Sequence, residues 1–309
     1  MTGPIRIAFF GTPDVALPAL QALLDAPDVE VMAVVTNPDR PKGRSRTPVA
    51  SPVKQAALAA GIDVLQPNRP VEIVDALEAM QLDACAIVAY GALLARPVLD
   101  AGGSGFVNLH FSLLPRWRGA APVQHALRAG DEVIGVTCFV LDEGMDTGPV
   151  LRTGELPIAP EATAGDLLDE LATIGAPLLL DAVRALVAGE QPTPQADEGV
   201  TLAPKVTPED VRIDWHRPAR ELADLVRSAN PAPGAHTTFD GERLKIWRAR
   251  PIAGVGEAGV VADRVDDGPV VGTGDGLLVL TQVQPAGKPR MSGAAFANGY
   301  QPLGGRLGS

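Results

Sequence analysis

The chain has 309 residues, a mass of 32.0 kDa and a formal net charge of −11, with 46% apolar and 20% charged residues. This length suits two domains, and this composition excludes an intrinsically disordered chain. The two cysteines lie in apolar runs, which excludes a disulfide scaffold and a cysteine-rich metal site. The longest uncharged apolar stretch, Ala84 to Ala95, has 12 residues, fewer than the roughly 20 that span a bilayer. Because the amino-terminal residues show no secretory signal, we expect a cytoplasmic globular protein.

The charge is unevenly distributed along the chain. Residues 1–200 hold 13 basic and 25 acidic residues, a balance of −12, whereas residues 201–309 hold 13 and 12, a balance of +1. A polyanion can therefore approach the second part without strong repulsion, which favours a nucleic-acid partner there. A surface whose charge is uneven for no functional reason is the alternative.

The first part of the chain alternates between short apolar runs and helical patterns. Ile5–Phe10 predicts a strand, and Asp14 then caps a helix with apolar residues at intervals of three and four. Further strands are predicted at Val29–Val35, Ile62–Leu65, Ala84–Ala89, Gly105–Phe111 and Val133–Leu141, and helices at Val53–Ala60, Val71–Met80 and Gln124–Ala129. Strands separated by single helices form βαβ units. We therefore predict an α/β domain over residues 1–188, with a doubly wound, mainly parallel sheet.

The remaining chain predicts a connection and a smaller domain. Two helices are expected at Asp166–Ala172 and Ala176–Ala188, broken by Gly175, and residues 189–204 have the composition of a linker. A helix at Pro218–Ala229 follows, and Asp240-Gly241 predicts a tight hairpin between two short strands. The expected strands of this domain are Thr237–Phe239, Arg243–Trp247, Gly259–Val265, Pro269–Gly272 and Leu277–Val283. One helix and five short strands predict an OB-like β-barrel over residues 205–309, although such a fold alone does not establish RNA binding.

Two polar side chains lie close together near the end of a predicted strand. Asn108 and His110 are two residues apart, so they project from the same face, at the edge of the sheet where open α/β folds bind ligands. An asparagine amide can donate to a developing oxyanion, and a histidine can transfer a proton near neutral pH. A purely structural role for this pair is the alternative.

A cluster of carboxylates follows the strand at Val133–Leu141. Asp142, Glu143 and Asp146 lie in a loop shaped by two glycines, and the catalytic interpretation requires one of them to reach His110. In the alternative interpretation, Asp142 caps the turn and the other two are solvated. The other histidines show no metal-ligand spacing, so no metal is expected.

A basic segment stands out within the acidic first part of the chain. Its four cations are Arg40, Lys42, Arg44 and Arg46. They lie in a connection that is unusually long, and such connections are commonly functional. A solvated loop without a partner is the alternative.

Ten short motifs carry a family resemblance. They are Phe10-Gly11-Thr12-Pro13-Asp14, Asn37-Pro38-Asp39-Arg40, Ser51-Pro52-Val53-Lys54, Val88-Ala89-Tyr90-Gly91, Asn108-x-His110-x-Ser112-Leu113-Leu114-Pro115, Arg118-Gly119-Ala120-Ala121-Pro122, Asp146-Thr147-Gly148, Arg212-Ile213-Asp214-Trp215, Asn230-Pro231 and Gln284-Pro285-Ala286-Gly287-Lys288. Over nearly its whole length the chain thereby resembles the methionyl-tRNA formyltransferase family. The Asn-x-His-x-Ser-Leu-Leu-Pro element marks the wider group of folate-dependent formyltransferases and hydrolases, whereas the basic loop and the late Pro-Ala-Gly-Lys point to the tRNA enzymes.

The resemblance implies a formyltransferase-like Rossmann domain, 10-formyltetrahydrofolate as co-substrate and methionyl initiator tRNA as acceptor. It implies that Asn108 is the oxyanion donor, that His110 transfers protons, and that Asp146 orients His110 or a water and favours the charged imidazole. Folate would be bound by Ser112, Leu113, Leu114, Pro115, Tyr90 and Gly91. The tRNA would be bound by Arg40, Lys42, Arg44 and Arg46 of the loop, and by Lys205, Lys245, Arg248, Lys288 and Arg290 of the second domain. No metal and no membrane contact is implied, and we expect a monomer.

The sequence departs from the family pattern at four positions, and other functions stay open. Phe111 and Ser45 replace smaller residues, and Ala232 and His236 stand where relatives often carry tryptophan. A formyltransferase acting on glycinamide ribonucleotide or an amino sugar, or a formyltetrahydrofolate hydrolase, would use the same polar residues but gives the basic loop and residues 205–309 no evident purpose. An RNA-binding module with an inactive α/β domain would not need all three polar side chains. A hydride-transferring enzyme is disfavoured because the glycine fingerprint is missing.

Overall fold

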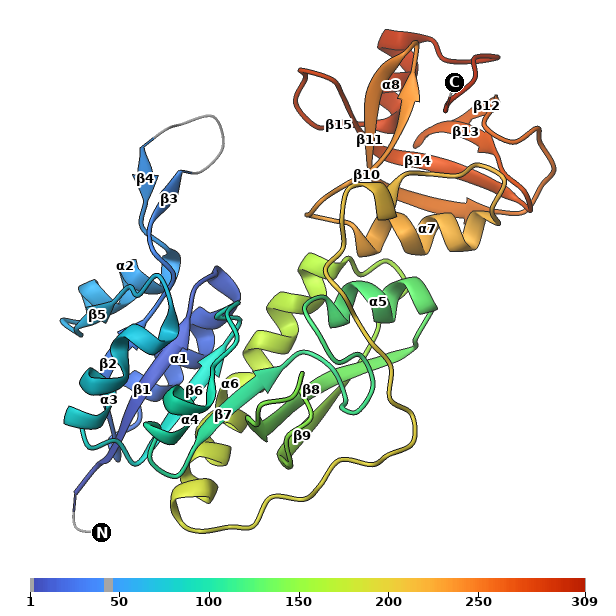
Figure 1. Cartoon of the computed structure of the whole chain (residues 1–309). Helices are drawn as coiled ribbons and strands as arrows, with labels where there is room; N and C mark the ends of the chain where they lie inside the picture. Colours follow the sequence, from blue (N-terminus) through green and yellow to red (C-terminus); the bar gives the residue numbers. More distant parts are fainter. Residues whose placement is uncertain (1–2, 42–46, 309) are drawn as a thin grey trace. The chain divides into compact units, whose positions relative to one another are not determined.

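Figure 1 shows the computed structural model of the chain, which describes residues 3–41 and 47–308. The chain divides into two compact units. The first consists of Met1–Pro122, Val133–Pro157 and Leu168–Leu202, and the second of Val123–Glu132, Ile158–Leu167 and Ala203–Ser309. Each unit is therefore assembled from segments that are not contiguous in the sequence. Within the part of the chain that the structure describes, no helix has the length and apolar character needed to cross a membrane.

The first unit is built on a seven-stranded sheet with the strand order β5-β2-β1-β6-β7-β8-β9. The strands are β1 (Ile5–Gly11), β2 (Val29–Val35), β5 (Val64–Leu65), β6 (Ala84–Val88), β7 (Phe106–His110), β8 (Val133–Val140) and β9 (Val150–Pro157). All pairs from β5 to β7 are parallel, whereas β8 runs antiparallel to both β7 and β9. The prediction of a mainly parallel α/β sheet is confirmed.

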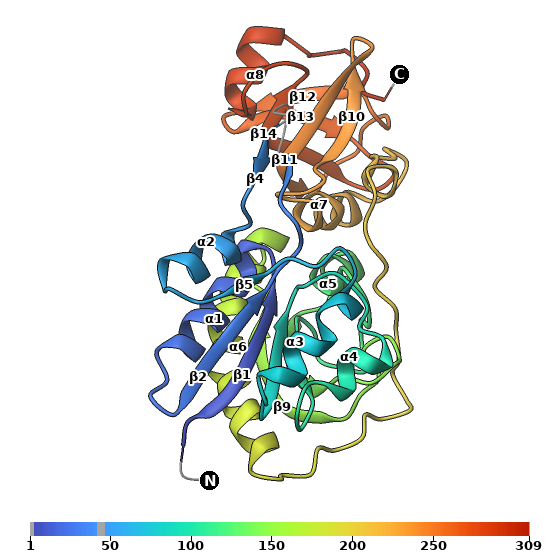
Figure 2. The same cartoon turned by 60° about the vertical axis from the view of Figure 1, so that its left-hand side comes forward.

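Helices cover both faces of this sheet (Figure 2). They are η1 (Asp14–Ala16), α1 (Leu17–Leu24), α2 (Pro52–Ala59), η2 (Pro70–Ile73), α3 (Val74–Ala79), α4 (Arg96–Asp100) and, shared between the two units, α5 (Pro122–Ala129) and α6 (Ala164–Val187). Leu77 of α3 and Val98 of α4 pack in one core with Phe10, Cys85 and Phe106, so these two helices cover the face to which Phe106 points. Two short strands, β3 (Arg40–Pro41) and β4 (Pro48–Val49), pair as a separate hairpin.

The prediction of a helix break at Gly175 is wrong. Residues 164–187 form one continuous helix, α6, with Gly175 and Pro177 in its interior. A Cβ atom at Gly175 would lie 2.8 Å from the side chain of Leu109, so the glycine lets the helix approach β7 closely. This packing outweighs the low intrinsic helix propensity of glycine, about 1 kcal/mol relative to alanine.

The second unit contains a six-stranded antiparallel sheet ordered β10-β11-β14-β13-β12, with β15 paired to β14. The strands are β10 (Ala235–Phe239), β11 (Glu242–Ile252), β12 (Val261–Val265), β13 (Gly268–Gly272), β14 (Leu277–Pro285) and β15 (Met291–Ser292), and the helical segments are η3 (Glu209–Val211), α7 (Ala219–Ser228) and α8 (Gly293–Tyr300). Asp240 and Gly241 both have positive φ, as a tight hairpin turn requires, so the predicted hairpin is confirmed. The predicted fold class, an α/β domain with a smaller β-domain, agrees with this architecture.

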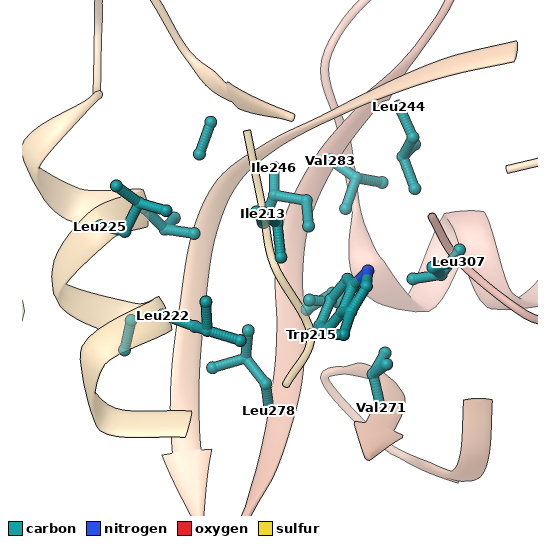
Figure 3. Packing of buried hydrophobic residues seen from close by; sticks show 14 of the residues in the cluster. Ile213, Trp215, Leu222, Leu225, Leu244, Ile246, Val271, Leu278, Val283 and Leu307 are labelled. Atoms are coloured by element: carbon teal, nitrogen blue, oxygen red, sulfur yellow. The ribbon is translucent and has the colours of Figure 1, made fainter. Parts of the chain in front are cut away.

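One core holds the second unit together, with Trp215 at its centre (Figure 3). Leu222 and Leu225 of α7 belong to this core together with Leu278 of β14, and the indole nitrogen of Trp215 donates to the hydroxyl of Thr237 at 3.1 Å. Helix α8 was not predicted from the sequence, and it begins at Gly293, a residue type of low helix propensity. Ser292 caps this helix by accepting from the backbone of Ala295 at 3.1 Å.

Candidate active site

The end of β7 carries the two polar side chains singled out in the sequence. Phe106, Asn108 and His110 alternate with buried residues that face α6, so all three project from the other face of the sheet. Phe106 lies in the core, whereas Asn108 is half-buried and further toward the carboxyl end of the strand. In residues 3–41 and 47–308 the structure gives the Asn108 side chain no hydrogen-bond partner, so its amide can donate to a substrate.

The loop after β7 folds back over His110. Thr137 of β8 lies opposite His110, and its hydroxyl donates to the carbonyl of Ser112 at 2.7 Å and accepts from the backbone of Leu114 at 3.1 Å. The hydroxyl of Ser112 donates to the carbonyl of Arg116 at 2.6 Å. As a result, the carbonyl of Trp117 lies 2.9 Å from Nε2 of His110. Because a carbonyl only accepts, Nε2 carries the hydrogen, and Nδ1 of the neutral ring keeps its lone pair.

Asp146 is the carboxylate that reaches His110. The 141–149 loop leaves β8 beside the start of β7, because Val140 pairs with Val107, and then doubles back. Oδ2 of Asp146 lies 3.8 Å from Nδ1 of His110 and accepts from the backbone of Gly119 at 2.7 Å.

The other two carboxylates of this loop do not take part in that contact. Oδ1 of Asp142 accepts from the backbone of Gly144 at 3.0 Å and from the hydroxyl of Thr147 at 2.7 Å, so it shapes the turn. Glu143 is exposed. Of the three carboxylates, Asp146 therefore faces His110, and the other two do not contact it.

Burial sets the charge of His110. The side chain is almost completely buried, and this desolvation lowers the pKa of His110 below its usual value of 6.5. The charge of Asp146 and the hydrogen bond to Trp117 raise that pKa, but burial outweighs both. The imidazole is therefore neutral at neutral pH, although Asp146 favours its charged form, and it can accept a proton at Nδ1.

We expect the free energy of unfolding to fall as the pH is lowered through 6.5 toward the depressed folded-state pKa of His110, because the unfolded chain then binds a proton that the folded ring resists. Above pH 6.5 the ring is neutral in both states and this contribution is fully present. Urea denaturation at about pH 7.5 and about pH 5.5 measures the difference.

The His110→Gln variant should show a smaller difference between the two pH values, with a remainder from His236, whose pKa is also lowered by burial. An exposed residue that does not titrate provides the control, and Gln191→Leu should behave as the unchanged chain does. An undiminished pH dependence in His110→Gln would contradict the assignment.

The residues implied in folate binding lie on neighbouring segments of the first unit. Tyr90 is buried, with its ring edge-to-face against Phe10 at 5.4 Å, and Gly91 follows with φ +82°. The side-chain amide of Asn37 donates to the carbonyl of Tyr90 at 2.6 Å and to the hydroxyl of Thr12 at 2.9 Å. This network joins the ends of β1, β2 and β6, which is the ligand-binding edge of a parallel sheet.

Ser112, Leu113, Leu114 and Pro115 form the loop directly after β7. Ser112 is fully buried and its hydroxyl is engaged within the loop, whereas Leu113 lies against Gly135 of β8. The structure thus places these four residues beside His110, with the Ser112 hydroxyl, the Ser112 carbonyl and the Leu114 amide engaged in hydrogen bonds within the protein.

Asp39, the residue directly before the β3–β4 hairpin, belongs to a charged cluster. Nζ of Lys54 lies 2.7 Å from Asp39 and donates to Gln66 at 2.6 Å, while Gln66 donates to Asp39 at 2.8 Å. Arg40 follows directly and is exposed in β3. Lys42, Arg44 and Arg46 lie outside the described residues.

Two of the predicted tRNA-binding cations of the second unit, Lys245 and Arg290, lie over one indole ring. The guanidinium of Arg290 lies 3.6 Å from the ring centroid of Trp247, and the ammonium of Lys245 lies 5.0 Å from it. Nε1 of Trp247 donates to Gln284, whose amide donates to the carbonyl of Lys288 at 2.8 Å. The indole therefore fixes the turn that carries Lys288 and Arg290.

The basic side chains of this region differ in their surroundings. Burial lowers the pKa of Lys245, and the neighbouring charges of Arg243 and Arg290 lower it further. By contrast, Nη2 of Arg248 lies 3.5 Å from a carboxylate oxygen of Asp166, so Arg248 is already paired. Lys205 is exposed in the connection before η3. Arg243, which the sequence analysis did not single out, belongs to the basic group around Lys245.

Comparison with known proteins relates both parts of the chain to one family. Residues 5–183 match the model described as formyl transferase, and residues 205–301 match the formyl transferase C-terminal domain. The methionyl-tRNA formyltransferase of Streptomyces coelicolor is 48% identical over 308 residues, which cover 96% of this chain and 96% of that protein. The chain belongs to the methionyl-tRNA formyltransferase family.

Two solved structures share the fold. HypX from Aquifex aeolicus in complex with tetrahydrofolic acid aligns with a TM-score of 0.68 at 20% identity, over 96% of this chain and 47% of HypX. WlaRD, a sugar 3N-formyl transferase, aligns with a TM-score of 0.67 at 17% identity, over 92% of this chain and 99% of WlaRD. Because a sugar enzyme spans both units, the presence of a second domain does not by itself distinguish a tRNA substrate from a sugar.

Two residues that contact the loops around His110 and Asp146 were not predicted from the sequence. Thr137 is a single threonine in a β-branched strand, and Gln195 lies in a segment whose composition is typical of a linker. Neither has a local sequence signal, because each acts through residues that are distant along the chain. The family motif at Arg118-Gly119 was recognised, but its contact with Asp146 was not.

Proposed function

We propose that this chain transfers the formyl group of 10-formyltetrahydrofolate to the α-amino group of methionine esterified to initiator tRNA. The observation that carries the proposal is the meeting of His110 and Asp146 beside Asn108, in a chain 48% identical over its length to a methionyl-tRNA formyltransferase. Folate is a co-substrate in this reaction, and the acceptor is an amine.

The reaction needs an oxyanion donor and a proton acceptor. Attack of the neutral amine on the formyl carbon forms a C–N bond and creates a tetrahedral intermediate with a negative oxygen and a positive nitrogen. Asn108 donates its amide hydrogen to the oxygen, and Nδ1 of the neutral His110 removes a proton from the nitrogen. The C–N bond to the folate then breaks, and the imidazolium returns the proton to the folate nitrogen. Asp146, 3.8 Å from Nδ1, stabilises the imidazolium between these two steps.

The test is a formyl-transfer assay with the purified chain and 10-formyltetrahydrofolate. We expect formylation of methionyl initiator tRNA, and little or none of methionyl elongator tRNA. Glycinamide ribonucleotide and a dTDP-linked amino sugar serve as competing acceptors in parallel reactions. Preferential formylation of either small amine would contradict the proposal. Hydrolysis of 10-formyltetrahydrofolate in the absence of an acceptor would favour the hydrolase alternative.

We expect Arg44→Ala to raise the KM for methionyl-tRNA by about tenfold or more, because a charge-assisted contact to phosphate contributes roughly 1.5–3 kcal/mol. The KM for 10-formyltetrahydrofolate should change far less. A plot of the logarithm of the apparent affinity against the logarithm of salt concentration has a negative slope, and the magnitude of this slope should decrease by about one. Arg69→Ala, which removes an exposed cation paired with Glu72 at 3.2 Å, is the control. Unchanged tRNA kinetics in Arg44→Ala would exclude this residue from tRNA binding.

A further inference from the structure

One glutamine in the long connection contacts both loops of the candidate active site. Nε2 of Gln195 donates to the backbone carbonyls of Asp146 at 2.9 Å and Gly148 at 2.8 Å. Its Oε1 accepts from Nη2 of Arg118 at 2.7 Å and from Nε at 3.2 Å. A primary amide has two donor hydrogens and two acceptor lone pairs, so this side chain is fully used.

These contacts act on the backbone and side chain of Asp146 together. Asp146 has φ +53°, a left-handed conformation that non-glycine residues adopt rarely and that surrounding contacts must maintain. Gln195 binds the carbonyl of this residue and that of Gly148, while the backbone of Gly119 binds its carboxylate at 2.7 Å. Gly119 follows Arg118, which Gln195 also holds. The 3.8 Å spacing between Asp146 and His110 therefore depends on a network that contains Gln195.

The chain is fixed on both sides of Gln195. Thr193 exchanges two backbone hydrogen bonds with Val150 at the start of β9, at 2.7 and 2.8 Å. Thr201 accepts from the backbone of Trp117 through its hydroxyl at 2.8 Å, and from that of Arg118 through its carbonyl at 2.9 Å. The glutamine is thus held in register with both loops.

We propose that Gln195 is a positioning residue for formyl transfer, which holds the carboxylate of Asp146 at the Nδ1 side of His110. The inference rests on the proposed function of that pair. It gives the segment 189–204 a role in the reaction, beyond connecting two parts of the chain.

The test compares three variants in steady-state formyl transfer from 10-formyltetrahydrofolate to methionyl initiator tRNA. Gln195→Leu should lower kcat by about 10- to 100-fold, the range expected when a reacting group is displaced by about 1 Å, with little change in either KM. The acid limb of its kcat profile should move to lower pH, because a displaced Asp146 no longer raises the pKa of His110. Gln195→Glu keeps an acceptor for Arg118 but loses the amide hydrogens, and it should lose kcat in the same way.

A matched control lies in the same segment. The exposed side chain of Gln191 contacts the carbonyl of Gly189 at 3.3 Å, and Gln191→Leu should keep the kcat and the pH profile of the unchanged chain. Circular dichroism and thermal melting establish that each variant is folded.

Three outcomes would overturn the inference. They are an unchanged kcat in folded Gln195→Leu, a reduced kcat with an unmoved acid limb, and an unchanged kcat in Gln195→Glu. The His110→Ala variant in the same assay separates this inference from the proposed function. If His110→Ala keeps full activity, the proposed site is wrong, whereas activity lost in His110→Ala but kept in Gln195→Leu rejects the positioning role alone.

Discussion

His110→Ala is expected to lower kcat for formyl transfer by about 10²–10⁴-fold, the usual contribution of a positioned proton-transfer group. Nδ1 is the ring atom that is free to accept a proton, because Nε2 is bound to the carbonyl of Trp117 at 2.9 Å. Without the ring, the proton released from the attacking amine has no buried acceptor beside Asp146. Single-turnover assays at saturating folate and tRNA measure this step directly.

The same substitution has a structural cost that must be separated from the catalytic effect. Removing the ring deletes the hydrogen bond from Nε2 to the carbonyl of Trp117, a contribution of about 0.5–1.5 kcal/mol. The hydrogen bonds among Ser112, Leu114 and Thr137 do not involve His110, so the loop retains its own supports. His110→Gln offers a second, polar replacement. If either variant is folded and turns over near the rate of the unchanged chain, His110 is not the proton acceptor.

The electrostatic arrangement around His110 explains why a buried histidine suits this reaction. Burial lowers its pKa and keeps the ring neutral, so in the proposed mechanism the base would be in its active form before the amine attacks. Asp146 acts in the opposite direction and lowers the cost of the imidazolium once the proton has moved. A carboxylate in direct contact would favour the charged ring in the resting enzyme, and a distant one would not stabilise it later. The separation of 3.8 Å lies between these extremes.

The sequence predicted the local features of the candidate site and missed those that depend on tertiary contacts. The two-residue spacing of Asn108 and His110 predicted their shared face, because alternation is a property of any strand. The carboxylates after Leu141 were found from composition alone, and only the family resemblance singled out Asp146, because β8 runs antiparallel to β7 and the loop must double back to reach His110.

One glycine misled the prediction of the helices. Gly175 predicted a helix end, but it lies within α6 because it lets the helix approach Leu109. A single sequence contains no sign of that approach, since the partner is 66 residues away along the chain. Gln195 was missed for the same reason, because its partners Asp146 and Arg118 lie far before it.

Asn108→Ala is expected to lower kcat by about 10²–10³-fold, the effect measured when one oxyanion donor is removed from an acyl-transfer site. The half-buried Asn108 amide has no partner in residues 3–41 and 47–308, so its removal breaks no internal hydrogen bond and should leave the folded state almost unchanged. The expected loss is therefore catalytic rather than structural.

The pH dependence separates Asn108 from His110. Asn108 does not titrate, so Asn108→Ala should lower kcat by the same factor at every pH and keep the acid limb that His110 produces. Asn108→Asp retains the size of the side chain but places a carboxylate where negative charge develops on the formyl oxygen, and it should be at least as slow as the alanine variant. Activity near that of the unchanged chain in Asn108→Asp would mean that the amide hydrogen does not face the oxyanion, and a different donor would then have to be sought along the main chain of the loop that follows β7.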